Sequence, residues 1–232
     1  YEISLGLVGS EMCIRDSLIV DLLAERQAFG EKGCEEIIRH FPGHDVFLWS
    51  PHIENPRKYP FGTRVKQPLE TDVIVITGSR KNVTLWEPWM DAVVSLIQNS
   101  KAEILGICFG HQIICAAFGG KIERDDKNHA FMAEVTYQNG KKVNQLFTHQ
   151  EFVTNSGEME VVASTEHCNI AACRHPSRPI RSVQFHPEAV KNVLDYALEC
   201  GDMSEQERAS FGDADQDLDV ASALIDAEAM GD

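Results

Sequence analysis

The sequence has no uninterrupted run of the roughly 18 to 20 apolar residues that a membrane-spanning helix needs, although 43% of its 232 residues are hydrophobic. It also opens without the basic segment and short apolar core of a secretory signal. Basic residues are few: 21 Lys and Arg stand against 36 Asp and Glu, for a formal net charge of −15. Nucleic-acid binding needs clustered cations that displace phosphate counterions. We therefore expect a cytoplasmic protein that binds neither a membrane nor a nucleic acid.

Two further absences concern cofactors. The seven cysteines form no C-x-x-C pair and no Cys/His spacing typical of a zinc site, so we expect reduced thiols that are mostly buried. The sequence also lacks the G-x-x-x-x-G-K-[ST] loop that cradles nucleotide phosphates. Gly119-Gly120-Lys121 is only a near miss, without the leading glycine or a following Ser or Thr. We expect no metal and no bound cofactor.

Length and charge divide the chain into three parts. Residues 1–17 show no clear helix or strand pattern and resemble a translated sequencing-adapter tract, so we treat them as a non-native segment. Residues 18–200 suffice for one globular domain with its own core. Residues 201–232 carry ten acidic side chains against Arg208 alone. We expect them to form a flexible, solvated tail, with a partner-binding helix as the alternative.

The first half of the sequence alternates between candidate strands and helices. Apolar runs such as TDVIVIT are typical of parallel strands that are buried on both faces. The alternation predicts an α/β fold with a doubly wound, mostly parallel sheet flanked by helices. Strands are expected at residues 17–21, 45–49, 71–77 and 103–108, helices at 25–41, 88–100 and 111–118, and a loop at 51–68.

The second half has a different pattern. Asn139-Gly140 separates two strand-like segments, residues 133–138 and 141–147, and this dipeptide is the strongest short signal for a hairpin. Antiparallel strands are therefore expected in this half. Further short strands are expected at residues 160–164, 170–174 and 180–185, followed by a helix at 188–199.

Cys108 occupies the centre of Gly106-Ile107-Cys108-Phe109-Gly110, between a predicted buried strand and a predicted helix. This G-x-nucleophile-x-G pattern is typical of a nucleophile elbow, where glycines allow a turn too sharp for side chains. The N-terminus of the following helix would favour the thiolate. A buried structural cysteine beside a tight turn is the alternative.

His186 and Glu188 supply a second element of the same hypothesis. In Gln184-Phe185-His186-Pro187-Glu188, residues 186 and 188 share one face of an extended segment, and Pro187 favours extended geometry at His186. Glu188 can therefore orient His186 while the other ring nitrogen exchanges a proton with Cys108. A lone histidine or glutamate is more often structural. Together with the nucleophile elbow at Cys108, however, His186 and Glu188 predict a catalytic triad.

Three motifs together resemble the class I, or triad-type, glutamine amidotransferases: ITGS at residues 76–79, GICFGHQ at 106–112 and QFHPE at 184–188. The resemblance covers about residues 18–198 and implies the flavodoxin-like fold of that family. Residues 161–188 are most similar to the amidotransferase subunit or domain of GMP synthase. Residues 78–89, GSRKNVTLWEPW, look more like its stand-alone relatives.

The resemblance implies roles for residues that match the family's motifs. Cys108 would be the nucleophile, His186 the general acid and base, and Glu188 the carboxylate that orients the histidine. An oxyanion hole would be formed by the backbone amides of Gly78, Ser79 and Phe109.

Substrate binding is implied for a further set of residues. Gln112 would contact L-glutamine, with a helix-surface amide as the alternative. Residues 148–151, THQE, match the family's Ser-His-x-Asp strip with Thr and Glu in place of Ser and Asp, so His149 and Gln150 would contact the substrate through their backbone. His111 and Cys115 are expected to be structural.

The absence of a phosphate-binding loop bears on the function that the resemblance implies. A glutaminase that releases ammonia would need an acceptor on another protein, a separate ATP-dependent synthetase subunit, with purine nucleotide synthesis as the favoured pathway. One alternative is a free-standing γ-glutamyl hydrolase of small amides or peptides. Another is a catalytically silent regulatory subunit. Dependence on a synthetase predicts an activity that rises on complex formation, whereas a free hydrolase would be fully active alone.

Overall fold

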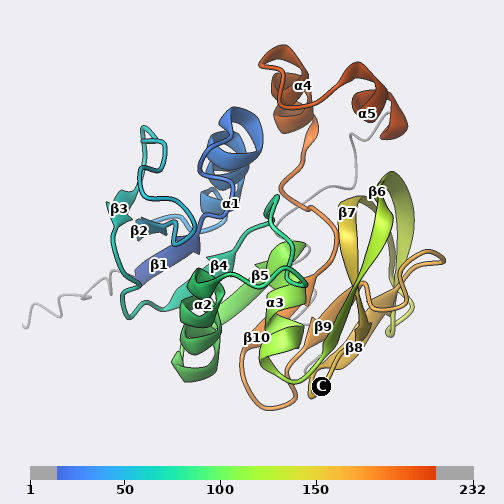
Figure 1. Cartoon of the computed structure of the whole chain (residues 1–232), viewed down its shortest axis with the longest axis horizontal. Helices are drawn as coiled ribbons and strands as arrows, with labels where there is room; N and C mark the ends of the chain where they lie inside the picture. The colour runs from blue at the N-terminus through green and yellow to red at the C-terminus, as the bar shows by residue number, and fades with distance from the viewer. Residues whose placement is uncertain (1–14, 213–232) are drawn as a thin grey trace, which may run out of the picture.

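Six neighbouring strands run parallel in one half of a ten-stranded sheet in the computed structural model, which describes residues 15–212 (Figure 1). The strand order is β3-β2-β1-β4-β5-β10-β9-β8-β6-β7, and the pairs from β10 to β7 are antiparallel. The strands are β1 (Arg15–Val20), β2 (His44–Trp49), β3 (Thr63–Val65), β4 (Val73–Ile76), β5 (Glu103–Ile107), β6 (Lys121–Tyr137), β7 (Lys142–Asn155), β8 (Glu160–Ser164), β9 (Ala172–Arg174) and β10 (Ile180–Val183). The predicted fold class, mostly parallel with antiparallel strands in the second half, is confirmed.

Helices cover both faces of the parallel half. α2 (Pro88–Asn99) and α3 (Phe109–Ala117) cover one face, and a π-helical turn η1 (Gln27–Lys32) with the following α1 (Gly33–Ile38) lies on the other. α4 (Lys191–Glu199) and α5 (Glu205–Ser210) pack instead against η1 and β6. Within the described residues, 15–212, no helix is both long and apolar enough to cross a membrane.

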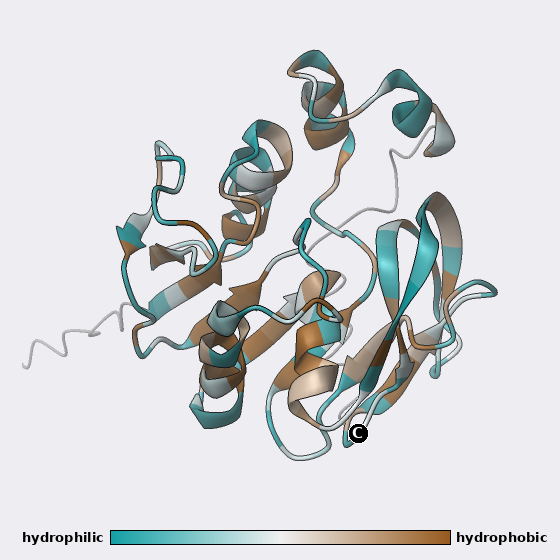
Figure 2. Ribbon diagram, viewed as in Figure 1, coloured by the Kyte–Doolittle hydropathy of each residue, from teal (hydrophilic) through white to brown (hydrophobic). Residues whose placement is uncertain are grey.

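The core is divided between the two faces of the sheet because successive side chains of a strand point in opposite directions. In β4, Ile74 and Ile76 pack with α2 and α3, whereas Val73 and Val75 pack with α1 on the other face. All four side chains are buried, as expected of a strand covered on both sides. Figure 2 shows the apolar character of the central strands next to the more polar outer helices.

The hairpin at Asn139-Gly140 forms as predicted but is much longer than the sequence suggested. Gly140 has a φ of 85° at the turn, and the Tyr137 N–H donates to the Lys141 carbonyl at 2.9 Å. β6 extends back to Lys121 through a stretch rich in charged side chains, with a register shift between Arg124 and His129. Its backbone pairing with β7 maintains this stretch as a strand, although its side chains have no apolar alternation.

Other differences are local. The predicted helix 25–41 is divided into η1 and α1, and Gly30 lies so close to the Leu23 carbonyl oxygen that an added Cβ would sit 2.2 Å from it. The predicted loop 51–68 contains the short edge strand β3. The predicted helix 188–199 begins only at Lys191, because residues before it form the segment that carries His186 and Glu188.

The predicted flexible tail is folded in its first part. Ser204 caps α5 with a reciprocal bond to Glu207, and Met203 and Phe211 on either side of the helix are buried against α4 and β7. Burial of these two apolar side chains stabilises the packed segment, and the prediction from its net charge did not take them into account. Residues 213–232 lie outside the described residues, as does most of the excluded N-terminal segment; β1 begins at Arg15.

Candidate active site

Cys108 lies at the turn where β5 ends and α3 begins. Its φ of 51° is the one positive φ of a non-glycine residue in the part of the chain that the structure describes. Cβ atoms added to the flanking glycines would lie 2.5 Å from the Gly110 carbonyl oxygen, for Gly106, and 2.3 Å from the Ile76 carbonyl oxygen, for Gly110. Both glycines are therefore required by close backbone packing. A strained residue retained at such a turn is a feature of functional sites.

Cys108 is 95% buried, and its thiol faces two polar groups. Its Sγ atom lies 3.6 Å from the Thr148 carbonyl oxygen, and the Gln184 side-chain amide donates to it at 3.6 Å. Because α3 starts directly after Cys108, the N–H of Phe109 lies in the first helical turn, where amides lack intrahelical partners.

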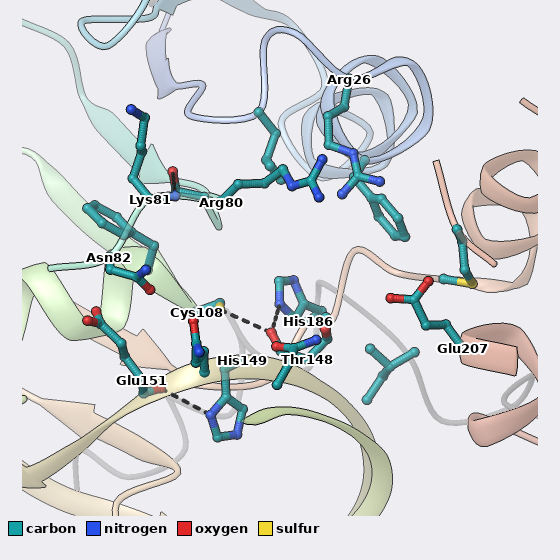
Figure 3. A pocket seen from close by; sticks show the side chains of 18 of the residues that line it. Arg26, Arg80, Lys81, Asn82, Cys108, Thr148, His149, Glu151, His186 and Glu207 are labelled. Carbon is teal, nitrogen blue, oxygen red and sulfur yellow. Dashed lines mark hydrogen bonds between the residues drawn. The ribbon is translucent and has the colours of Figure 1, made fainter. Parts of the chain in front are cut away.

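His186 lies between Cys108 and Glu188, in the order that a nucleophile, base and orienting carboxylate require. Its Nδ1 is 2.8 Å from Glu188 Oε1. Its Nε2 is 3.3 Å from the Thr148 carbonyl oxygen, which also contacts the Cys108 thiol (Figure 3). Both ring nitrogens therefore face oxygen acceptors. This arrangement suits an imidazolium, which donates from both nitrogens.

Electrostatics favour the same protonation state. Burial alone would lower the pKa of His186, but the charges of Glu188 and Cys108 and hydrogen bonds to both outweigh it and raise that pKa well above the usual value. Glu188 is itself buried, and its second oxygen has no hydrogen-bond partner within residues 15–212. A buried carboxylate of this kind is costly unless a cation lies beside it.

The loop that follows β4 approaches the same histidine. Gly78 has no side chain here, and an added Cβ would lie 2.9 Å from His186 Cε1 and 3.7 Å from Cys108 Cβ. Thr77 fixes the start of the loop, since its hydroxyl accepts from the Leu22 N–H at 3.0 Å and donates to the Gly78 carbonyl at the same distance. Ser79 turns the chain outward, accepting the Lys81 N–H at 3.1 Å.

Glu151 on β7 anchors the far end of that loop. Its buried carboxylate accepts the N–H of Val83 at 2.6 Å, the N–H of Thr84 at 3.1 Å and the Thr84 hydroxyl. Hydrogen bonds to a carboxylate are stronger than bonds between neutral groups. The sequence marked this residue only as a departure from the family's motif, and its anchoring role had no signal there.

Gln112 and the strip at residues 148–151 meet at one wall of the site. The Gln112 amide donates to the Glu151 carbonyl at 2.7 Å and to Gln184 Oε1 at 3.2 Å. His149 contacts the Glu151 carbonyl at 3.0 Å through Nδ1, and burial lowers its pKa to about 4, so the ring is neutral. The Gln112 amide nitrogen is thus already engaged, and Gln112 is not a helix-surface residue.

His111 is structural, as predicted. It is fully buried, with Nδ1 2.8 Å from the Ser182 hydroxyl and Nε2 3.1 Å from the Ile170 carbonyl, and burial lowers its pKa to about 3. Ligand atoms of His111, Cys115 and Cys173 lie within 4.8 Å of one another. A metal there would have to displace one of the two histidine hydrogen bonds inside a closed core.

A cavity of about 390 Å³ opens over Cys108 and His186. It brings together most of the residues predicted for the site: Ser79, Cys108, Phe109, Gln112, His149, Gln150 and His186 line it, whereas Glu188 lies behind His186. Its remaining wall comes from residues that the sequence did not single out. These include Arg26, Phe29, Arg80, Asn82, Asn128, Met203, Glu207 and Phe211.

This α/β fold, with a cysteine at the strand-to-helix turn and a His/Glu pair beside it, matches one class of protein in sequence and structure. Residues 54–199 match the glutamine amidotransferase class-I family, and the chain belongs to that family.

Relatives and solved structures agree with this assignment. The glutamine-hydrolyzing GMP synthase subunit of Methanocaldococcus jannaschii is 34% identical over 107 residues, which cover 41% of this chain and 55% of the relative. A glutamine amidotransferase-like protein of Schizosaccharomyces pombe is 29% identical over 157 residues, or 61% of each chain. The match thus spans about half to three fifths of the length of these relatives. A glutamine amidotransferase from Thermotoga maritima shares the fold, with a TM-score of 0.63, 17% identity and coverage of 93% of this chain and 90% of that one.

Proposed function

We propose that this protein hydrolyses L-glutamine to glutamate and ammonia through a γ-glutamyl thioester on Cys108. The proposal rests mainly on the positions of the three side chains. The Cys108 thiol and His186 Nε2 both contact the Thr148 carbonyl oxygen, and Glu188 Oε1 lies 2.8 Å from His186 Nδ1. Family membership supports the same chemistry.

Each residue would have one role in this reaction. The Cys108 thiolate attacks the side-chain amide carbon, and His186, oriented by Glu188, protonates the departing ammonia. Water then attacks the thioester and gives its proton to His186. The amides of Phe109 and of the Gly78–Ser79 segment would stabilise the oxyanion, each donor contributing about 3 kcal/mol to the transition state.

The ammonia would be consumed by a separate ATP-dependent synthetase subunit. The similarity to glutamine-hydrolyzing subunits of GMP synthase supports this role and a place in purine nucleotide synthesis. A second candidate, a free-standing γ-glutamyl hydrolase, is favoured by one observation: the loop after Gly78 is anchored by Glu151 of the same chain, so its order requires no partner.

The test is release of glutamate and ammonia from L-glutamine by the purified protein, with and without 6-diazo-5-oxo-norleucine. Turnover that stops when a single adduct forms on Cys108, located by mass spectrometry, is the expected result. Cys108→Ala should abolish turnover and labelling while the circular dichroism spectrum stays unchanged. Near-native turnover by that variant would contradict the proposal, and no turnover without a partner would support a silent or partner-activated subunit.

A further inference from the structure

The cavity extends beyond Cys108 on the side of His186. In Figure 3, Arg26, Arg80 and Glu207 surround that end, whereas Asn82 and Glu151 lie on the other side of Cys108. Apolar residues of the cavity wall include Phe29, Met203 and Phe211. Because His186 would protonate the amine that departs, the leaving group must lie at this end.

The cavity as a whole is large enough for a substrate whose leaving group is larger than ammonia. The whole cavity measures about 390 Å³, within the roughly 300–1,000 Å³ of sites that enclose drug-sized ligands. Its wall includes segments outside residues 54–199, which match the family: Arg26 and Phe29 precede them, and Glu207 and Phe211 follow. Segments from both ends of the described chain therefore enclose the side where the leaving group departs.

Most charged groups that line the cavity are already engaged. Arg26 is bound to Asp202, with Nε 3.5 Å from Oδ1, and Lys81 is bound to Glu87 at 2.9 Å. Glu207 accepts the Ser204 N–H at 2.9 Å and the Ser204 hydroxyl at 2.8 Å.

Arg80 is the exception among these cations. It has neither a hydrogen bond nor an ion pair within residues 15–212, and its guanidinium points into the cavity (Figure 3). Hydrogen bonds from Ser204 are the main cause that lowers the pKa of Glu207, and the charges of Arg26 and Arg80 lower it further. Arg80 nevertheless forms no ion pair with Glu207, whose carboxylate is bound to Ser204. A guanidinium presents paired donors that match a carboxylate.

We infer that this end of the cavity is a leaving-group subsite, and that the protein hydrolyses γ-glutamyl amides of amino acids whose carboxylate binds Arg80. The inference rests on the proposed thioester chemistry of Cys108 and extends its substrate class. Sγ bonds to the side-chain amide carbon of the glutamyl group (Cδ) and the C–N bond to the leaving amine breaks. The nitrogen keeps the electron pair of that bond and takes a proton from His186, and the amino acid leaves. Water then cleaves the thioester, returning a proton to His186 and releasing glutamate.

The test compares three substrates that differ only in the leaving amine: γ-glutamylglycine, γ-glutamylmethylamide and L-glutamine. Glycine carries a carboxylate that methylamine lacks. We expect kcat/KM for γ-glutamylglycine to exceed that for the methylamide by about tenfold, as one charge-assisted hydrogen-bonded pair provides. Arg80→Gln should remove this preference and leave kcat/KM for the methylamide and glutamine within about twofold of wild type. Lys101→Gln, an equal charge change at an exposed residue of the loop before β5, should leave the preference intact.

The outcomes separate this inference from the proposed function. Hydrolysis of glutamine without hydrolysis of γ-glutamylglycine overturns the leaving-group subsite and leaves the glutaminase assignment in place. An equal loss on all three substrates in Arg80→Gln also overturns it, because Arg80 would then bind the glutamyl part. If no substrate is cleaved and 6-diazo-5-oxo-norleucine leaves Cys108 unmodified, the chain by itself lacks the proposed chemistry, and the inference is overturned with it.

Discussion

The space around His186 depends on the absence of a side chain at position 78. A methyl group at Gly78 would lie 2.9 Å from His186 Cε1, a distance that forces the ring or the loop to move. We expect Gly78→Ala to lower kcat by on the order of 10²-fold, since a displacement of about 1 Å at a catalytic group has that effect. Initial rates of glutamine hydrolysis, with thermal unfolding measured in parallel, check this prediction.

Gly33 provides the matched control. It lies at the start of α1 with a φ of −61°, and an added Cβ would make an ordinary contact of 3.6 Å with the Glu188 Cγ atom. Gly33→Ala should therefore keep kcat within about twofold of wild type, because helical geometry accepts alanine without strain. Equal losses in the two variants would show that general loosening of the site, rather than contact with His186, causes the effect.

The protonation of His186 gives a pH dependence with a defined sign. Its raised pKa means that the ring retains its proton as the pH rises past the usual value. Activity that needs this proton falls only when the pH rises through the raised pKa. Glu188→Gln removes one cause of the elevation, so the basic limb of the kcat/KM profile should move to lower pH. A limb that stays in place would show that Glu188 does not control the titration.

The sequence predicted which residues would lie together at the site but not all of the contacts that they form. Cys108, His186 and Glu188 belong to motifs whose local geometry is defined by backbone rules, such as glycines at a sharp turn and period two in an extended segment. Thr148 contributes through its carbonyl oxygen, and Arg80 through a guanidinium that forms no ion pair within residues 15–212. Every residue has a backbone carbonyl, and whether an arginine forms an ion pair depends on its neighbours in the fold. A sequence pattern therefore detects neither the position of the Thr148 carbonyl nor the unpaired state of Arg80.

The loop after β4 is the element whose order matters most for the proposed reaction. Replacing Glu151 by Gln turns one acceptor into a donor that faces the N–H groups of Val83 and Thr84. The loss of a charge-assisted hydrogen bond, about 1.5–3 kcal/mol, should lower kcat/KM by about tenfold or more. Hydrogen exchange of residues 79–87 should quicken in the same variant.

Thr84→Val separates the two parts of this anchor. It removes only the hydroxyl that bonds Glu151 and leaves both backbone bonds to the carboxylate intact. A smaller effect than that of Glu151→Gln is expected. If Glu151→Gln leaves both the exchange rates and the kinetics unchanged, the loop is ordered by other contacts.

The segment around α5 tests the boundary between domain and tail. Truncation after Gly201 removes the buried Met203 and Phe211, whereas truncation after Gly212 keeps them. Loss of a buried Phe side chain costs about 3–5 kcal/mol, so the shorter chain should unfold at a clearly lower temperature. Differential scanning calorimetry of the two truncated chains checks this prediction, and equal melting temperatures would mean that the segment around α5 adds no stability.

Elements were predictable where the local pattern agreed with the packing. The apolar runs of β4 and β5 predicted buried parallel strands, because a strand that is buried on both faces has a continuous apolar sequence rather than an alternating one. The first half of β6 was missed because its charged side chains are exposed and only pairing with β7 makes it a strand. A nonlocal partner of this kind leaves no trace in a short window of sequence.

At the scale of the whole molecule, the cavity joins parts of the chain that are distant in sequence. Its wall combines the β5–α3 turn, β7, the segment around η1 and the segment around α5. The parallel and antiparallel strands form one continuous sheet behind it. A ligand held there contacts elements from both ends of the described chain, so the free energy of binding adds to the stability of the whole fold.

Covalent labelling should therefore raise the unfolding temperature of the entire molecule. We expect 6-diazo-5-oxo-norleucine to shift wild-type protein to a higher melting temperature in a single transition, because the labelled cavity joins both ends of the described chain on one continuous sheet. Cys108→Ala should show no shift at the same reagent concentration. The chain truncated after Gly201 should gain less from labelling than the chain truncated after Gly212, since the wall residues Met203, Glu207 and Phe211 are missing. An equal gain in the two truncated chains would show that the segment around α5 does not contact the bound group.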